Sequence, residues 1–236
     1  MNLPDLSLQL LYGRLGWAIV LATAACALWR GAAPIPRVAL ALVLAAALAA
    51  MALPGQLSPA WWLGLAFQYP SGLLVGCCLL RLAERWNGIR RSQAMPRALA
   101  GVLVVGGALL YLDAIGVLAR GFYYAGFGQA APLVGIAGAI GCVLAIALGR
   151  ARRPAASLLG ALALFSLLRL PTGNLWDAVI DPLLWAWAIV ALLAAALGRS
   201  GRRAADRRGE TDPAPAPTPA PAMQPLATER FSSLKE

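Results

Sequence analysis

Apolar residues occur in long, nearly charge-free runs, and this feature most limits what the chain can fold into. The run VALALVLAAALAAMAL covers residues 38–53, and WAIVALLAAALG covers residues 187–198. A helix of about 20 apolar residues crosses the hydrocarbon core of a bilayer, and these runs approach that length. Charged residues make up only 13% of the 236-residue chain, too few for the surface of a soluble domain. The sequence therefore predicts an all-α, polytopic membrane protein.

The apolar runs and the breakers between them predict about seven transmembrane helices. The sixth run is short and ends at Arg169-Leu170-Pro171, so six spans is the alternative count. The expected spans are 15–31, 37–53, 61–82, 97–118, 131–149, 154–170 and 178–198.

Arginines alternate between rich and poor connections along the chain. Three connections are poor in arginine. The connection at 54–60 has none, the one after the fourth span has only Arg120, and the one after the sixth span has only Arg169. Arginine-rich loops are typical of the cytoplasmic side, so we expect the amino terminus outside, the carboxyl terminus inside, and a bacterial inner-membrane location. This alternation requires an odd number of spans, which favours seven. The rich connections hold Arg30 and Arg37, then Arg81, Arg85, Arg90, Arg91 and Arg97, then Arg150, Arg152 and Arg153, and finally Arg199, Arg202, Arg203, Arg207 and Arg208.

Two regions are expected, a transmembrane helical domain at 1–198 and a disordered cytoplasmic tail at 199–236. The tail begins with a basic stretch and continues as a Pro/Ala-rich tract that can bury little apolar surface. Its arginines are expected to contact anionic lipids at the cytoplasmic face. The tail is either a solvated tether or a spacer that carries a docking segment for a cytoplasmic protein at 224–236, with Phe231 as the anchor. No nucleic-acid partner is expected, because the arginines follow the ends of the apolar runs.

The residue types needed for several kinds of chemistry are missing. The chain has no histidine, which excludes histidine-based catalysis and histidine ligation of haem or zinc. The cysteines lie inside apolar runs without CxxC spacing, which favours buried packing over a metal site. We expect no metal, no cofactor and no catalytic set, and the sequence favours a non-catalytic protein over an enzyme. The cysteines are Cys26, Cys77, Cys78 and Cys142.

Polar residues gather near the expected outer ends of the spans and predict an outward-facing ligand pocket. Gln68 and Tyr69 precede Pro70-Ser71-Gly72, a sequence that interrupts a helix. Interrupted helices at membrane depth are tolerated where they face protein or water. The candidate pocket residues are Gln68, Tyr69, Asp113, Arg120, Arg169, Asp177 and Asp181.

Each acid in this set also has a structural explanation. Asp181 before Pro182 is typical of a helix N-cap, and Asn174 with Asp177 resembles a capping box. A continuous helix through both aspartates would instead place Asp177 and Asp181 four residues apart on one face. For Asp113, the alternatives are an ion pair with Arg120 or Arg169, a role in binding or proton transfer, and snorkelling to the interface.

Small residues predict where helices pack closely. Gly72 and Gly76 are four residues apart in the third expected span, and Gly135, Gly138 and Gly141 are three apart in the fifth. Such spacings allow the backbones of neighbouring helices to approach each other.

Three classes of function fit these features. The favoured one is a non-catalytic assembly, anchoring or lipid/glycan-handling component of a bacterial envelope system. The aromatic cluster GFYYAGFG at 121–128 suits a membrane interface and also suits stacking on a sugar or lipid headgroup. The second class is a small transporter or ligand-binding protein that uses the candidate pocket. The third is an enzyme acting on a lipid-linked substrate at the outer leaflet, with Asp113 or Asp177 as general base.

Overall fold

The structure, a computed structural model, describes residues 4–29, 35–89 and 95–210, with side chains up to residue 197. Helices are the only regular elements within these ranges, which confirms the all-α class. Seven of the described helices have 15 or more residues: α1 (Leu6–Ala27), α2 (Arg37–Ala52), α4 (Gly72–Trp86), α5 (Arg97–Ala114), α7 (Ala131–Ala147), α8 (Arg152–Leu168) and α10 (Pro182–Glu210). The shorter ones are η1 (Gly55–Leu57), α3 (Pro59–Phe67), α6 (Phe122–Ala125) and α9 (Leu175–Val179).

The chain divides into two compact units, Met1–Ala195 and Ala196–Glu236. Helix α10 begins in the first unit and continues to Glu210, through the basic stretch at 199–210 that the sequence predicted as disordered. Arginine, alanine and glutamate are strong helix formers, which accounts for this continuation. The possible docking segment at 224–236 lies outside the described residues.

Two described helices are long and apolar enough to cross a membrane, α1 and α5. Length and composition alone do not separate such helices from the core helix of a soluble protein. Helices α2 and α7 and the Pro182–Leu197 part of α10 are apolar but shorter. The prediction of seven complete spans is therefore not confirmed, because several expected ranges include residues that the structure places in loops.

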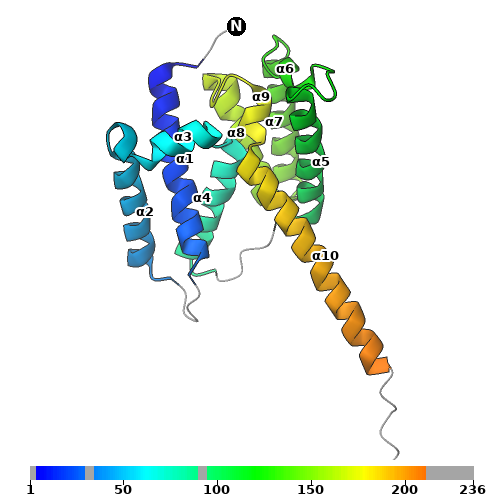
Figure 1. Cartoon of the computed structure of the whole chain (residues 1–236). Coiled ribbons are helices and arrows are strands. Elements are labelled where there is room, and N and C mark those ends of the chain that lie inside the picture. The colour runs from blue at the N-terminus through cyan, green and yellow to red at the C-terminus, as the bar shows by residue number, and fades with distance from the viewer. Residues whose placement is uncertain (1–3, 30–34, 90–94, 211–236) are drawn as a thin grey trace, which may run out of the picture. The chain divides into compact units, whose positions relative to one another are not determined.

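The third expected span, 61–82, is broken into two helices. Ser58 caps α3 by accepting a hydrogen bond from the Ala60 N–H at 3.2 Å, and Ser71 caps α4 through the Leu74 N–H at 3.1 Å. Between them Gln68 ends α3 with φ +60°, a backbone conformation that only glycine adopts easily. The serine caps and Pro70 thus split one apolar run into two helices with different directions (Figure 1).

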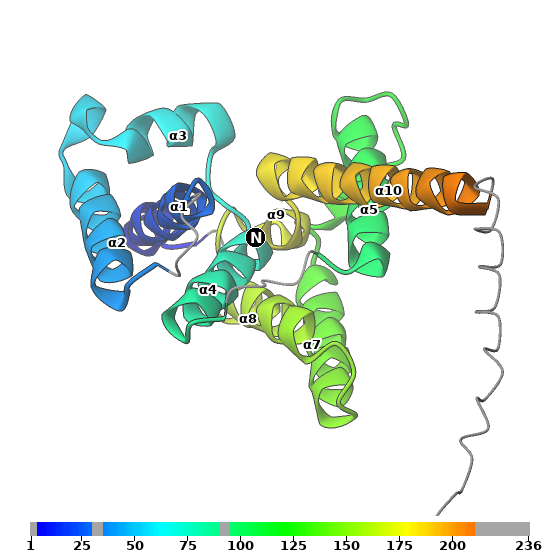
Figure 2. The same cartoon turned by 90° about the horizontal axis from the view of Figure 1, so that it is seen from below.

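Within Met1–Ala195, neighbouring helices follow one another in the order α2, α1, α4, α8, α7 (Figure 2). The glycines of α4 pack closely on α8: a Cβ on Gly72 would lie 2.9 Å from the Ala161 backbone, and one on Gly76 would lie 3.0 Å from Ser157. The predicted close packing at these two glycines is confirmed. Gly135 and Gly138 likewise face α8, whereas Gly141 faces open space.

The buried core is small and the outer faces are apolar. Trp17, Leu103, Phe165 and Leu184 are among the buried side chains. Helix α7 exposes a continuous apolar surface. Its exposed large side chains are Leu133, Val134, Ile136, Ile140, Val143 and Leu144.

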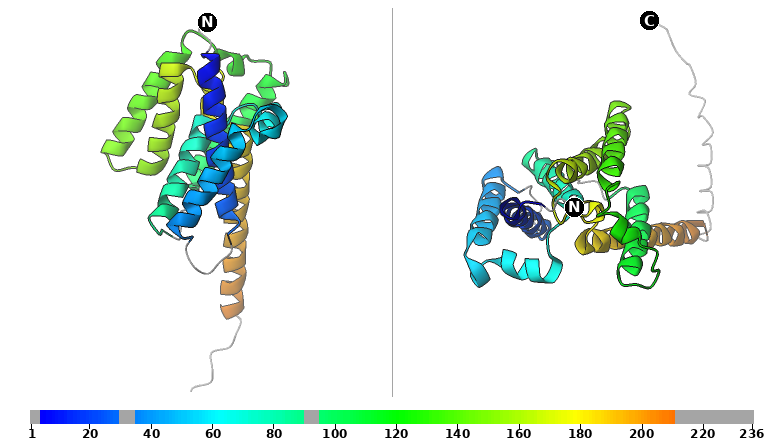
Figure 3. Two further views of the ribbon diagram at one scale, coloured as in Figure 1. Left: turned by 90° about the vertical axis from the view of Figure 1, so that its left-hand side faces the viewer. Right: turned by 90° about the horizontal axis from the view of Figure 1, so that it is seen from above.

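The helix termini of the first unit gather at two opposite ends (Figures 1 and 3). One end carries the start of α1, helices α3, α6 and α9, and the start of α10; we name it the carboxylate end after Asp113, Asp177 and Asp181. The opposite end carries the last turns of α1, α4 and α7 and the first turns of α2, α5 and α8. We name it the arginine end after its described arginines: Arg37, Arg81, Arg85, Arg97, Arg150, Arg152 and Arg153.

Candidate functional site

Asp113 organises the loop after α5. Its carboxylate accepts hydrogen bonds from the backbone N–H groups of Arg120 (2.7 Å), Gly121 (3.0 Å) and Tyr123 (2.8 Å), and the residue is buried. Among the described residues, Asp113 forms no ion pair with Arg120 or Arg169, so the ion-pair alternative is wrong. Backbone donors provide enough compensation for a buried carboxylate. Asp113 therefore shapes the turn at 119–123.

Asp181 connects two helices at their amino ends. Oδ1 accepts a hydrogen bond from the Leu184 N–H at 2.8 Å, which confirms the predicted N-cap of α10. Oδ2 accepts from the Ser71 N–H at 2.7 Å, immediately before α4. The residue is only 7% exposed, so both hydrogen bonds lie inside the protein.

Asn174 caps α9 and joins it to α6. Its Oδ1 accepts from the Trp176 N–H at 2.9 Å, and its Nδ2 donates to the Tyr123 carbonyl at 3.2 Å. The Leu175 N–H donates to the Gly126 carbonyl at 3.1 Å, which adds a direct backbone contact. Asn174 is fully buried and was missed as a candidate pocket residue, although its position before an apolar helix start was a visible capping signal.

Asp177 contacts hydroxyl groups and does not complete a capping box. It accepts hydrogen bonds from the Thr172 Oγ1 at 2.5 Å and from the Tyr123 hydroxyl at 3.1 Å. Ile180 has extended backbone angles between α9 and α10, so the continuous helix that would align Asp177 with Asp181 is wrong. Burial raises the pKa of Asp177, partly offset by the two hydroxyl donors. Burial, followed by the nearby Asp177 charge, raises the pKa of Tyr123 to about 12.

The two remaining arginines of the candidate pocket form no ion pair with any described acid. Arg169 ends α8 with φ +57°, and its guanidinium lies 5.2 Å from the centre of the Phe165 ring. The Arg120 side chain is exposed, and only its backbone contacts Asp113. The predicted set is thus divided: three acids hold loops and helix ends, and the two arginines form no ion pair with a described acid.

Gln68 and Tyr69 lie in a different place, in a groove between α1, η1 and α3. The groove has a volume of about 420 Å³ and is also lined by Arg14, Trp17 and Trp61. The Trp17 indole donates to the Gln68 carbonyl at 3.2 Å. Sequence reasoning missed Arg14 because the first span was expected to begin at residue 15, whereas α1 begins at Leu6. We name this cavity the Arg14 groove.

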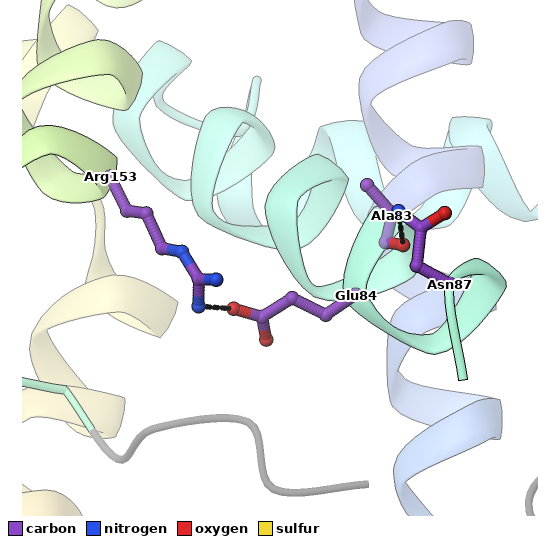
Figure 4. A network of polar contacts seen from close by, with 4 residues as sticks. All are labelled: Ala83, Glu84, Asn87 and Arg153. Atoms are coloured by element: carbon purple, nitrogen blue, oxygen red, sulfur yellow. Dashed lines mark hydrogen bonds and ion pairs between the residues drawn. The ribbon is translucent and has the colours of Figure 1, made fainter. Parts of the chain in front are cut away.

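The arginine end contains the one ion pair among the described residues, between Arg153 of α8 and Glu84 of α4 (Figure 4). Other arginines there satisfy carbonyls at helix ends. The Arg37 Nε donates to the Trp86 carbonyl at 2.9 Å, and Arg85 donates to the Cys26 carbonyl. Cationic groups at helix carboxyl ends are stabilising because the carbonyl dipoles point toward them. The predicted arginines Arg30, Arg90 and Arg91, and those after residue 198, lie outside the described side chains.

The described residues contain no group of three or more histidine, cysteine, aspartate or glutamate side chains placed to hold a metal ion. The geometry can bind an anion at Arg14 and can accept a proton at Asp177, the acid whose partners are side-chain hydroxyls. Comparisons with protein families, with curated proteins and with solved structures find no match.

Proposed function

We propose that this chain is a multi-pass bacterial inner-membrane protein with seven crossings, its amino terminus outside and its carboxyl terminus in the cytoplasm. Its role is non-catalytic, as an assembly, anchoring or lipid/glycan-handling component of an envelope system. The carboxylate end faces outward and the arginine end faces the cytoplasm.

The apolar outer faces support a membrane location. The apolar windows of α1 and α5 are only 39% and 22% buried inside the protein, whereas a core helix of a soluble protein is mostly buried. Exposed apolar patches beyond a few hundred Å² are unusual on soluble proteins. Lipid would cover the exposed side chains of α7 and α5.

The separation of charge between the two ends is the observation that carries the proposal. Seven described arginines lie at the arginine end, against Arg14, Arg120 and Arg169 at the other. Four described acids lie at the carboxylate end, namely Asp5, Asp113, Asp177 and Asp181, and Glu84 at the arginine end is paired with Arg153. Positive charge concentrated on one side of a helical bundle is typical of the cytoplasmic side of a membrane protein.

The use of the acids supports a non-catalytic role. Asp113 and Asp181 are buried, and their oxygens accept hydrogen bonds from the backbone, so neither is free to act on a substrate. The same contacts weaken the transporter alternative, which needs Asp113 in an open pocket.

Reporter fusions test the orientation directly. Alkaline phosphatase, which folds only outside the cytoplasm, should be active after residues 56, 121 and 173. A fluorescent protein that matures only in the cytoplasm should be bright after residues 88 and 150 and at Glu236. A phosphatase signal at Glu236, or bright fluorescence after residue 121, would overturn the proposed orientation.

One observation keeps the enzyme alternative in view. Asp177 is partly exposed, has a raised pKa and contacts two hydroxyl groups, the features of a proton acceptor. The test is complementation of a strain that lacks the protein. If Asp177→Asn fails to complement while its expression and melting temperature stay unchanged, the non-catalytic role is wrong and the enzyme alternative is favoured.

A further inference from the structure

We infer that the Arg14 groove binds the phosphate group of an anionic membrane lipid, with the lipid tail lying along α1 and α3. The assignment rests on the proposed membrane location, and it adds a ligand class and a site that the orientation alone does not give.

Arg14 is a charge inside a candidate membrane span. It lies eight residues after Leu6, about 12 Å along the axis of α1 at 1.5 Å per residue. Asp113, an acid in the other candidate span, accepts three backbone hydrogen bonds, but Arg14 has no acid within 4.0 Å among the described residues. A charged group within a span is costly and is normally paired or functional.

The groove supplies a second polar group beside Arg14. The Gln68 side chain is exposed and makes no hydrogen bond to any described residue, while its backbone carbonyl is held by Trp17. A guanidinium and a neutral amide form a set of donors suited to phosphate oxygens, since arginine binds phosphate through parallel N–H groups.

The backbone keeps these donors at the groove. Gln68 has φ +60°, and a Cβ on the neighbouring Gly13 would lie 2.8 Å from the Tyr69 ring. The tyrosine therefore packs directly on the α1 backbone beside Arg14. Non-glycine residues in such conformations cluster at ligand sites, where the surrounding structure holds them in place.

The remaining walls are apolar and aromatic, which selects a ligand with a tail. Trp17 is buried, whereas Trp61 and Leu65 are about half and two-thirds exposed at 47% and 68%. Indole rings favour the headgroup level of a bilayer. A free phosphate ion would leave these walls unused, whereas the glycerol and upper acyl carbons of a lipid would cover them.

Native mass spectrometry of the full-length chain in detergent tests the inference. Titration with dioleoyl phosphatidylglycerol should give one tightly bound lipid, and Arg14→Gln should weaken that binding about tenfold or more, since a hydrogen bond to a charged group is lost. The matched control is Arg120→Gln, which removes an exposed arginine at the same end but outside the groove and should leave binding unchanged.

Two further probes separate the possible sources of phosphate. Dioleoylglycerol has the same tails without phosphate and should bind at least about tenfold more weakly. Glycerol phosphate has the headgroup without tails and should not displace the lipid. Equal binding of dioleoylglycerol would overturn the assignment of a phosphate, and full displacement by glycerol phosphate would overturn the assignment of a lipid.

A variant that fills the groove keeps the test decisive if Arg14→Gln does not fold. A Cβ on Gly64 would meet no atom within 4 Å, so Gly64→Phe adds bulk at the groove without a backbone clash. It should also weaken the binding of phosphatidylglycerol. Equal weakening by Arg14→Gln and Arg120→Gln would show general attraction to anionic lipid and overturn the site. If the reporters give the expected orientation but the lipid-binding assay fails, the proposed lipid site is wrong and the proposed topology still holds.

Discussion

At the scale of single residues, the carboxylate end holds two buried acids with backbone hydrogen-bond donors and one exposed arginine without an acidic partner. Asp113 and Asp181 accept hydrogen bonds from backbone N–H groups, which compensates for their burial. Arg14 is exposed in the groove and forms no ion pair with a described acid. Buried acids whose oxygens accept backbone hydrogen bonds hold the structure in place. An exposed guanidinium without an acidic partner is available to a ligand.

Asp181 should contribute to stability through both of its oxygens. Asp181→Ala removes the cap of α10 and leaves the Ser71 N–H without its acceptor, and should lower the free energy of unfolding by about 2 kcal/mol. Asp181→Asn keeps one oxygen for the α10 cap but turns an amide donor toward the Ser71 N–H, so it should cost at least half of that. Thermal melting of the purified chain in detergent measures the difference. Equal melting temperatures for the wild type and Asp181→Ala would contradict the double contact.

Asp177 should make stability depend on pH. Burial raises its pKa from the ordinary 3.8, so the folded state holds the proton more tightly than the unfolded state. The contribution to stability is complete below the ordinary pKa and is lost as pH rises through the raised value. The melting temperature should therefore fall from about pH 4 upward, and Asp177→Asn should remove this part of the slope.

The hydroxyl partner of Asp177 gives a second check on this prediction. The Tyr123 hydroxyl lowers the pKa of Asp177, so Tyr123→Phe should raise that pKa further and shift the loss of stability to higher pH. A melting temperature that rises with pH in the wild type and not in Asp177→Asn would have the opposite sign and would contradict the burial effect.

At the scale of elements, close helix packing depends on glycines that look alike in sequence. Gly72 lies against the Ala161 backbone, whereas Gly141 has no neighbouring atom within 4 Å of an added Cβ. Gly72→Ala should destabilise the protein by about 1–3 kcal/mol through overpacking between α4 and α8. Gly141→Ala should be neutral or stabilising by up to about 1 kcal/mol, because alanine favours the helix. Melting temperatures of the two variants check this, and equal losses would contradict the packing.

The element boundaries also show how far the sequence could lead. The cap at Asp181 and the helix start at Pro182 were predictable because they depend on adjacent residues. The start of α1 at Leu6 was not predictable from hydropathy, which reports apolar content only. The first residues of this helix include the polar Ser7 and Gln9, and Asp5 caps it.

The candidate site was predictable as a set of polar residues near one end, but not in its arrangement. The contacts between α6 and α9 join residues about 50 positions apart, and their partners are backbone groups that carry no sequence signal. For the same reason the sequence could not separate the three alternatives for Asp113, and none of them named the backbone donors.

At the scale of the whole molecule, charge at the arginine end should orient the helices, and the α7–α8 connection tests this most cleanly. Arg150, Arg152 and Arg153 lie together there, and only Arg153 forms an ion pair, with Glu84. Replacing all three by glutamine removes the local excess of positive charge and should raise alkaline phosphatase activity severalfold in fusions after residue 153. Replacing all three by lysine keeps the charge and should leave the reporter at the wild-type level.

The lysine variant also separates charge from the shape of the ion pair. Lysine retains a cation for Glu84 but not the planar guanidinium, so a topology that depends on charge survives the change, whereas one that depends on the particular Arg153 contact does not. The phosphatase reporter could also stay inactive in the glutamine variant. In that case, packing of α8 on α4 through Gly72 and Gly76 is enough to hold α7 and α8 in their orientation. Arginine placement would then follow the orientation without causing it.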